Sequence, residues 1–312
     1  MLNLMLLNSD TIRRHTRTVL VSLIALITIF VIQAVTTSRC NAQGCPHPAI
    51  NGRQPYPSEL ITPFDNAGLN RLGGSGPGQA RIWSGYPINR SGTWNHRPYV
   101  PCILLKTIGY TESTGWFQFN VSTYGSTGPT FISGDCGYGI MQITSGMDGS
   151  LGSLFSPQRV AGEPTYNIGT GALFLQRKWN SIIYDYDNNI GENDPMIVEN
   201  WYYTVWAYNG WSYFNNPNNP RYPWPRSAWR CGQGGQTRAN WPYQELVWGC
   251  AANPPTYQSG GQAVPFWGAV SLTLPTRSLI TDPPPQHINT PQNYHRSCGW
   301  VFLPLVQKNY TP

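Results

Sequence analysis

The chain has 312 residues and a formal net charge of +6, with 11% charged residues beside 32 Gly, 28 Pro, 13 Trp and 18 Tyr. The length fits one good-sized domain or two small ones, and the composition is unlike that of a typical cytosolic protein. The first 42 residues carry four Arg and one Asp, so the remainder is only mildly basic. This charge would suit an anionic cell wall but is too weak to argue for nucleic-acid binding.

The N-terminus has the pattern of an export signal. Arg13, Arg14 and Arg17 precede an uncharged run of 17 residues from Val19 to Val35. A basic stretch followed by an apolar one is typical of a signal peptide, whereas 17 residues is the lower limit for a membrane span. We therefore predict that residues 1–42 are a signal peptide or an N-terminal membrane anchor. The protein would be secreted or extracytoplasmic, and it would contact a membrane only if this segment stays uncleaved.

The cysteine count agrees with cleavage after Ala42. Removing the segment that contains Cys40 leaves six of the seven cysteines, enough for three disulfides in an oxidising compartment. Cys231 and Cys250 bracket a Trp-containing segment and form the natural local pair. The remaining expected pairs are Cys102 with Cys136 and, by elimination, Cys45 with Cys298.

Helical patterns follow an irregular start. Residues 43–97 are rich in Pro, Gly and Asn, and we interpret them as an irregular lead-in. A helix should begin near Pro101, because Leu104, Ile108 and Glu112 recur every four residues on one face.

Two more helices are expected later in the chain. The first runs from Thr165 to Trp179 and the second from Pro195 to Tyr208, both with apolar residues three and four apart. Glycine-rich turns at 134–152 precede them. After residue 211 the chain becomes rich in Asn, Pro and Trp, and residues 251–312 are predicted to be a Pro-rich C-terminal tail.

Glu112 is the first candidate for chemistry. It shares a helix face with Leu104 and Ile108, and an apolar setting raises the pKa of a carboxyl group. A carboxyl that stays protonated near neutral pH is what a glycosidase uses to protonate a leaving oxygen. Position alone, however, favours a solvated glutamate at a helix end.

Four motifs in a fixed order change this interpretation. An apolar helix ends in Glu-Ser at 112–113, and Gly-x-Gly-Ile-Met-Gln follows at 137–142. Asn-Ile-Gly at 167–169 and Ala-Tyr-Asn at 207–209 come next. Residues 99–212 thus resemble the superfamily of soluble lytic transglycosylases and goose-type lysozymes, similar to glycoside hydrolase family 23. The resemblance implies a mainly α, lysozyme-like domain with long irregular loops, over residues 98–250, with a Pro/Gly/Trp-rich C-terminal extension.

The resemblance also implies roles for single residues. Glu112 matches the catalytic acid/base and Ser113 the small polar residue after it. Met141 and Gln142 match the pair that lines the glycan groove, and Gln142 would hydrogen-bond the sugar. Tyr208 matches the tyrosine near the catalytic glutamate and Asn209 its structural neighbour. Asn167 and Gly169 match a segment that supports the core.

Asp135 separates two mechanisms. The Gly-Asp-x-Gly portion looks like goose-type lysozymes, in which the aspartate helps to activate water, but Thr144 stands where that group tends to carry a second aspartate. A hydrolase would use Glu112 with Asp135 as the second carboxylate. A transglycosylase needs only Glu112 and the substrate's N-acetyl group, and gives a 1,6-anhydro product.

We therefore expect an exported enzyme that cleaves the β-1,4 bond between N-acetylmuramic acid and N-acetylglucosamine in peptidoglycan strands, with a slight preference for the transglycosylase outcome. A non-catalytic wall-binding protein on the same scaffold is the alternative from another class. The chain has neither the zinc-binding motif His-Glu-x-x-His nor the nucleophile motif Gly-x-Ser-x-Gly. We interpret the acidic loop Asp185–Asp194 as solvated rather than as a calcium site. The sequence thus predicts no metal and no cofactor.

Overall fold

The computed structural model describes residues 44–84, 99–184, 188–284 and 287–288. The unit Cys45–Pro312 is considered by itself. Its described part is mainly helical, as expected, with short strands that pair only two at a time. The six α-helices are α2 Pro57–Gly68, α3 Cys102–Ser113, α4 Pro157–Gly162, α5 Pro164–Tyr184, α6 Tyr202–Tyr208 and α7 Tyr243–Ala252.

The strands form three small ladders within these residues. They are β1 Asn51–Arg53 antiparallel to β2 Thr127–Pro129, β3 Asn189–Ile190 parallel to β6 His287–Ile288, and β4 Thr256–Ser259 antiparallel to β5 Gln262–Pro265. Single 3-10 turns lie at Gly73–Ser75, Val198–Trp201, Tyr213–Asn215, Arg238–Asn240 and Arg277–Leu279. The other described residues form turns and irregular segments, with turns prominent at 134–152, where glycine-rich turns were predicted.

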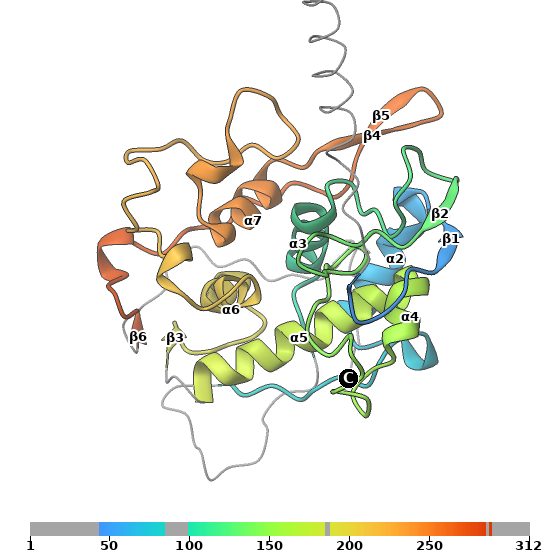
Figure 1. Cartoon of the computed structure of the whole chain (residues 1–312). Coiled ribbons are helices and arrows are strands. Elements are labelled where there is room, and N and C mark those ends of the chain that lie inside the picture. The colour runs from blue at the N-terminus through green and yellow to red at the C-terminus, as the bar shows by residue number, and fades with distance from the viewer. Residues whose placement is uncertain (1–43, 85–98, 185–187, 285–286, 289–312) are drawn as a thin grey trace, which may run out of the picture. The chain divides into compact units, whose positions relative to one another are not determined.

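The 21-residue helix α5 is the centre of the packing. Helices α2, α3, α4 and α6 all contact it (Figure 1). The expected helix Thr165–Trp179 is confirmed, and it continues to Tyr184 because Ile182 and Ile183 extend the buried face. Trp179 packs on Trp201 with 4.3 Å between ring centroids. The expected helix Pro195–Tyr208 forms only in its second half, as α6, after the 3-10 turn Val198–Trp201.

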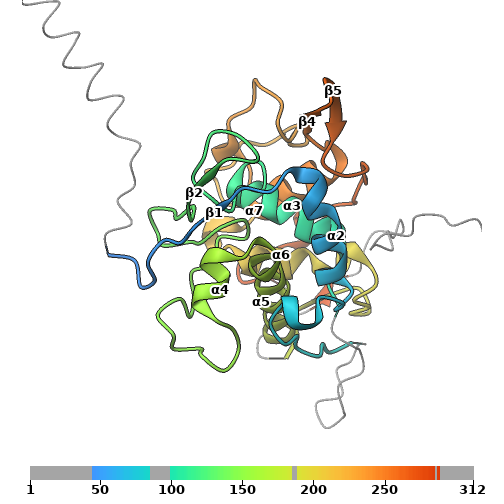
Figure 2. The same cartoon turned by 90° about the vertical axis from the view of Figure 1, so that its right-hand side faces the viewer.

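Helix α3 begins directly after Pro101, as predicted, and ends after Ser113. The helix stops there because Thr114 adopts a left-handed conformation with φ 49°. Both cartoon views place α3 between α2 and α7 (Figures 1 and 2), and both neighbours contact it. Helix α3, which carries Glu112 in its last turn, is therefore packed from both sides.

The prediction that residues 43–97 are an irregular lead-in is wrong for helix α2. Pro57 stands in the first turn, where its missing N–H costs nothing, and Leu60, Phe64 and Ala67 form a buried face. The ring of Phe64 lies 4.6 Å from that of the fully buried Trp116, which follows α3. The segment is thus part of the core.

The prediction that residues 251–312 are only a Pro-rich tail is wrong for the part that follows α7. Phe266 and Trp267, which follow the β4–β5 hairpin, are buried against Trp116 and Tyr110. The predicted strand or docking tail at 301–306 lies outside the described residues.

One of the three expected disulfides is confirmed, between Cys231 and Cys250. The pairings Cys102–Cys136 and Cys45–Cys298 are wrong, because Cys45 is bonded to Cys136. Cys102, the first residue of α3, is itself in a disulfide, but its partner cannot be Cys136, because Cys136 is already bonded to Cys45.

Disulfides of this kind are typical of proteins outside the cytosol. Among the described residues, no helix has the length and apolar character needed to cross a bilayer. The expected signal peptide or anchor at 1–42 lies outside the described residues.

Candidate active site

Glu112 lies in the last turn of α3, only partly exposed, and one carboxyl oxygen accepts a 2.5 Å hydrogen bond from the hydroxyl of Tyr243. Burial raises the pKa of Glu112 from 4.5 to about 7. The Tyr243 hydrogen bond and the charge of Arg238 act against this increase in pKa, and the charge of Asp135 adds to it. Near neutral pH the carboxyl can therefore both give and take a proton.

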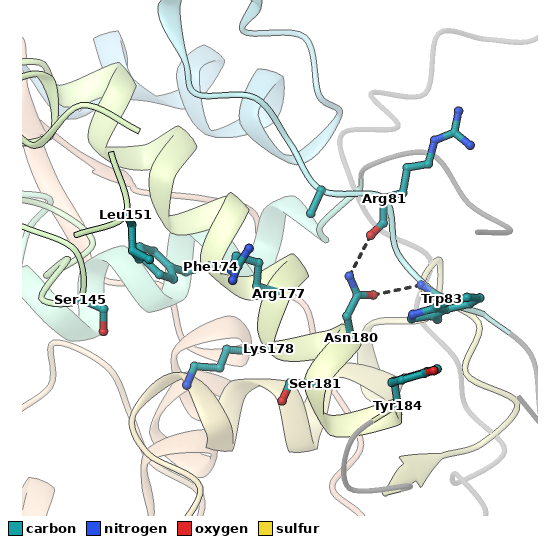
Figure 3. Close-up of a pocket in the computed structure, with 11 residues that line it drawn as sticks. Arg81, Trp83, Ser145, Leu151, Phe174, Arg177, Lys178, Asn180, Ser181 and Tyr184 are labelled. Carbon is teal, nitrogen blue, oxygen red and sulfur yellow. Dashed lines mark hydrogen bonds between the residues drawn. The ribbon is translucent and has the colours of Figure 1, made fainter. Parts of the chain in front are cut away.

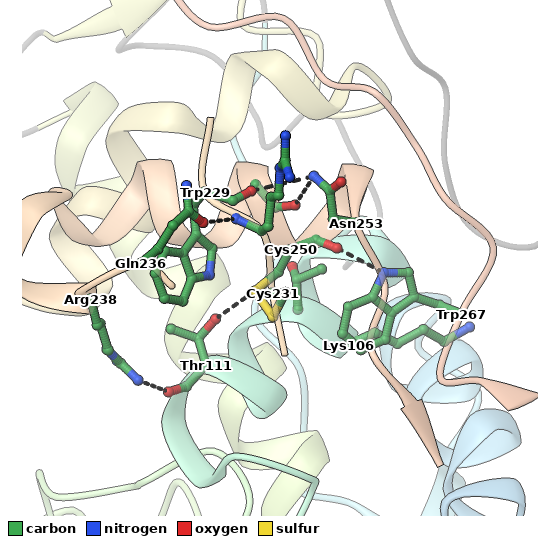
Figure 4. The surroundings of a disulfide bond; sticks show 12 residues. Lys106, Thr111, Trp229, Cys231, Gln236, Arg238, Cys250, Asn253 and Trp267 are labelled. Atoms are coloured by element: carbon green, nitrogen blue, oxygen red, sulfur yellow. Dashed lines mark hydrogen bonds between the residues drawn. A yellow bond between two sulfur atoms is a disulfide. The ribbon is translucent and has the colours of Figure 1, made fainter. Parts of the chain in front are cut away.

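Tyr243 and Arg238 come from the segment closed by the Cys231–Cys250 disulfide. Tyr243 is the first residue of α7 and is buried. Arg238 donates a 2.6 Å hydrogen bond to the carbonyl of Thr111, and the Thr111 hydroxyl lies 3.8 Å from Cys250 Sγ (Figure 4). The segment is thus tied to the helix turn that carries Glu112.

Neither residue was predicted to belong to the site. The sequence pointed to the two cysteines around them, but a single tyrosine and a single arginine in a loop have no spacing that would distinguish them.

Tyr208 and Gln142, both predicted to bind substrate, lie together. They line a cavity of about 110 Å³ with Thr144. The Tyr208 hydroxyl donates a 2.7 Å hydrogen bond to the carbonyl of Met141. Burial, and to a smaller extent the charge of Glu112, raise the pKa of Tyr208 well above 10, so Tyr208 lies within the electrostatic reach of the carboxyl.

Asp135 is exposed and accepts a 2.5 Å hydrogen bond from the Ser133 hydroxyl. The Ser133 hydroxyl also accepts a 2.9 Å hydrogen bond from the N–H of Gly137, so it links Asp135 to the backbone of the turn. Asp135 is near enough to raise the pKa of Glu112. Its position is therefore compatible with either predicted role, a second carboxylate or a turn residue.

Three other predicted residues lie away from this cavity. Ser113 is buried, and its hydroxyl donates to the carbonyl of Gly109 within α3. Met141 is fully buried, with its side chain against Gly171 of α5, so it packs the core rather than lining an open groove. Asn209 is exposed after α6, where its oxygens accept weak hydrogen bonds from Asn215.

Asn167 holds the turn that carries Gln142. Its side-chain oxygen accepts the N–H of Met141 at 2.8 Å, and its amide nitrogen donates to the carbonyls of Tyr138 and Val160. This fully buried amide replaces the missing backbone partners of an irregular segment. The core-support role expected for Asn167 has a clear physical basis.

No family model, curated protein or solved structure matches the chain. Within the described ranges, no group of three or more His, Cys, Asp or Glu side chains is arranged to hold a metal ion. The function must therefore be argued from the site itself.

Replacing Tyr243 by Phe should shift the pH dependence of any reaction that needs protonated Glu112. The lost hydroxyl removes a hydrogen bond that lowers the pKa of Glu112, so the pKa should rise above about 7. The fall of kcat/KM on the alkaline side should then move to higher pH. Tyr213→Phe, on an exposed tyrosine, is the control. If the alkaline fall of kcat/KM is unchanged in Tyr243→Phe, the Tyr243 hydroxyl does not control the pKa of Glu112.

Proposed function

We propose that the protein cleaves the glycan strands of peptidoglycan, with Glu112 as acid and base. The observation that supports this most is a carboxyl at a helix end with a pKa of about 7, hydrogen-bonded to Tyr243 and within electrostatic reach of Tyr208, which lines a cavity together with Gln142. The four ordered motifs supply the substrate class and the lysozyme-like fold. Export, with or without a retained N-terminal anchor, would bring the enzyme to the wall.

The preferred reaction is transglycosylation. Glu112 gives its proton to the glycosidic oxygen as the bond from C1 of N-acetylmuramic acid breaks. The acetamido oxygen of the same sugar bonds to C1 and carries the positive charge. Glu112, now a carboxylate, takes the proton of the 6-hydroxyl, whose oxygen displaces the acetamido oxygen from C1. The product is a 1,6-anhydro sugar, and no second carboxylate is needed.

Hydrolysis is the second candidate, because Asp135 raises the pKa of Glu112 and so lies within its electrostatic reach. Asp135 would hold a water molecule against the opposite face of the sugar. We prefer transglycosylation because Asp135 is exposed and already accepts the Ser133 hydroxyl.

Mass spectrometry of the products from purified peptidoglycan tests the proposal. Strand ends with a 1,6-anhydro sugar are expected from the wild-type protein and none from Glu112→Gln. Reducing ends would support the hydrolase instead. Binding without any cleavage would contradict both reactions and favour a non-catalytic wall-binding protein.

The Asp135→Asn substitution distinguishes the two reactions by rate. In a transglycosylase it should leave kcat within about twofold of wild type, because an asparagine can still accept the Ser133 hydroxyl. In a hydrolase it should lower kcat by about 10²–10⁴-fold, the usual contribution of a general base. The measurement is the initial rate on purified strands. A loss of about 10²–10⁴-fold in kcat would overturn our preference for transglycosylation.

A further inference from the structure

A second, larger cavity of about 920 Å³ lies along the C-terminal half of α5 (Figure 3). One wall is a face of the helix, with Phe174, Arg177, Lys178 and Ser181 at helical spacing. The opposite wall consists of residues 80–83. Asn180 holds them against the helix, because its amide donates to the carbonyl of Arg81 and its oxygen accepts the N–H of Trp83. The cavity thus has two walls that are fixed to each other by the fold.

The described lining is positively charged. It contains Arg81, Arg177 and Lys178 and no Asp or Glu. None of the three cations takes part in an ion pair with another described residue. Arg81 points away from α5, whereas Lys178 extends toward Ser145 on the rim (Figure 3). Arg177 and Lys178 are therefore the charges available to a ligand lying along the helix.

This cavity adjoins the smaller one at Gln142 and Tyr208, because three residues line both. The two share Ser145, Phe174 and Lys178, and the smaller one reaches Gln142 and Tyr208. A molecule bound in the smaller cavity, beside Tyr208, can therefore extend over Lys178 into the larger cavity.

We propose that this cavity binds an acidic peptide branch of the glycan strand that is cleaved at Glu112. The inference rests on the proposed function, because it assumes a strand at Glu112. The lactyl group of each muramic acid carries such a peptide, and its free carboxylates match the cations Arg177 and Lys178. Charge-assisted hydrogen bonds to carboxylates are stronger than neutral ones and would select peptide-bearing strands over bare ones.

The test compares peptide-bearing strands with the same strands after enzymatic removal of their peptides. Binding is measured in the Glu112→Gln background, which prevents turnover during the measurement. The wild-type cavity should bind peptide-bearing strands about tenfold more tightly than bare ones, and Arg177→Gln with Lys178→Gln should abolish that preference. The matched control is Arg71→Gln, which removes an exposed positive charge outside the cavity lining. Lys178→Arg, which keeps the charge, should retain the preference.

A preference that survives in the double glutamine variant, or that disappears equally in Arg71→Gln, would overturn the inference. Cleavage of bare strands by the unmodified enzyme is measured in parallel. If bare strands are cleaved but peptide-bearing strands bind no better, only this inference fails. If neither strand is bound or cleaved, the proposed function fails, and this inference with it.

Discussion

Glu112→Gln should lower the turnover of peptidoglycan strands by at least about 10²–10⁴-fold, the usual contribution of a general acid and base. Glutamine has nearly the same shape but can neither give nor take back a proton. Glu163→Gln is the matched control, since this exposed glutamate pairs with Arg159 on the surface. Retention of most of the wild-type rate in Glu112→Gln would refute the assignment of the acid.

The same variant should not lose stability at high pH. Because the pKa of Glu112 is raised from 4.5 to about 7 in the folded protein, ionising this carboxyl disfavours folding. The penalty is absent below the unfolded pKa, grows as the pH rises, and is complete above about pH 7. Glutamine cannot ionise, so the Tm of Glu112→Gln should equal or exceed that of wild type above pH 7. A clear loss of Tm would mean that lost activity reflects unfolding.

Gly139→Ala should cause the largest loss of stability, about 3–5 kcal/mol. Gly139 has φ 66°, and a Cβ atom there would lie 2.2 Å from Gln118 Oε1 and 2.6 Å from Asn167 Nδ2. These buried amides accept the N–H groups of Ile140 and Met141, so the clash would break the contacts that hold the turn before Gln142. Denaturant unfolding measures the loss.

The matched control for this variant is Gly149→Ala. Gly149 also has a positive φ, 84°, but nothing lies within 4 Å of its Cβ position. Its substitution should cost only about 1–2 kcal/mol, for the left-handed backbone alone. If both variants lose the same stability, the clash of a Cβ atom with Gln118 and Asn167 is not the reason for a glycine at position 139.

Periodicity predicted the helices that carry continuous apolar faces. Helices α3 and α5 appear where Leu104, Ile108 and the residues around Trp179 indicated them. Helix α2 was missed because it contains two prolines, Pro57 and Pro63, and precedes a glycine-rich stretch, although Leu60 and Phe64 are four apart. A short helix whose stability comes from packing on a distant segment has a weak local signal.

The site was predictable only where residues lie within motifs. Glu112, Gln142 and Tyr208 were identified in this way, and the structure brings Gln142 and Tyr208 to one cavity. Tyr243 was not identified, because it is 131 residues away from Glu112 and meets it only through the packing of α7 on α3. Met141 illustrates the opposite error, since a motif position can serve the core instead of the ligand.

The contact between Tyr243 and Glu112 also determines how short a fragment with the candidate site can be. The four motifs end at residue 209, and a minimal fragment drawn from them would stop near 212. Such a fragment would keep the acid but lose Tyr243, Arg238 and the disulfide-bonded segment that presents them. The surface of α3 that α7 covers would then face water. A fragment with the motifs alone would therefore carry a more exposed Glu112, and the pKa of its carboxyl would fall toward 4.5, because burial is the main cause of its raised pKa.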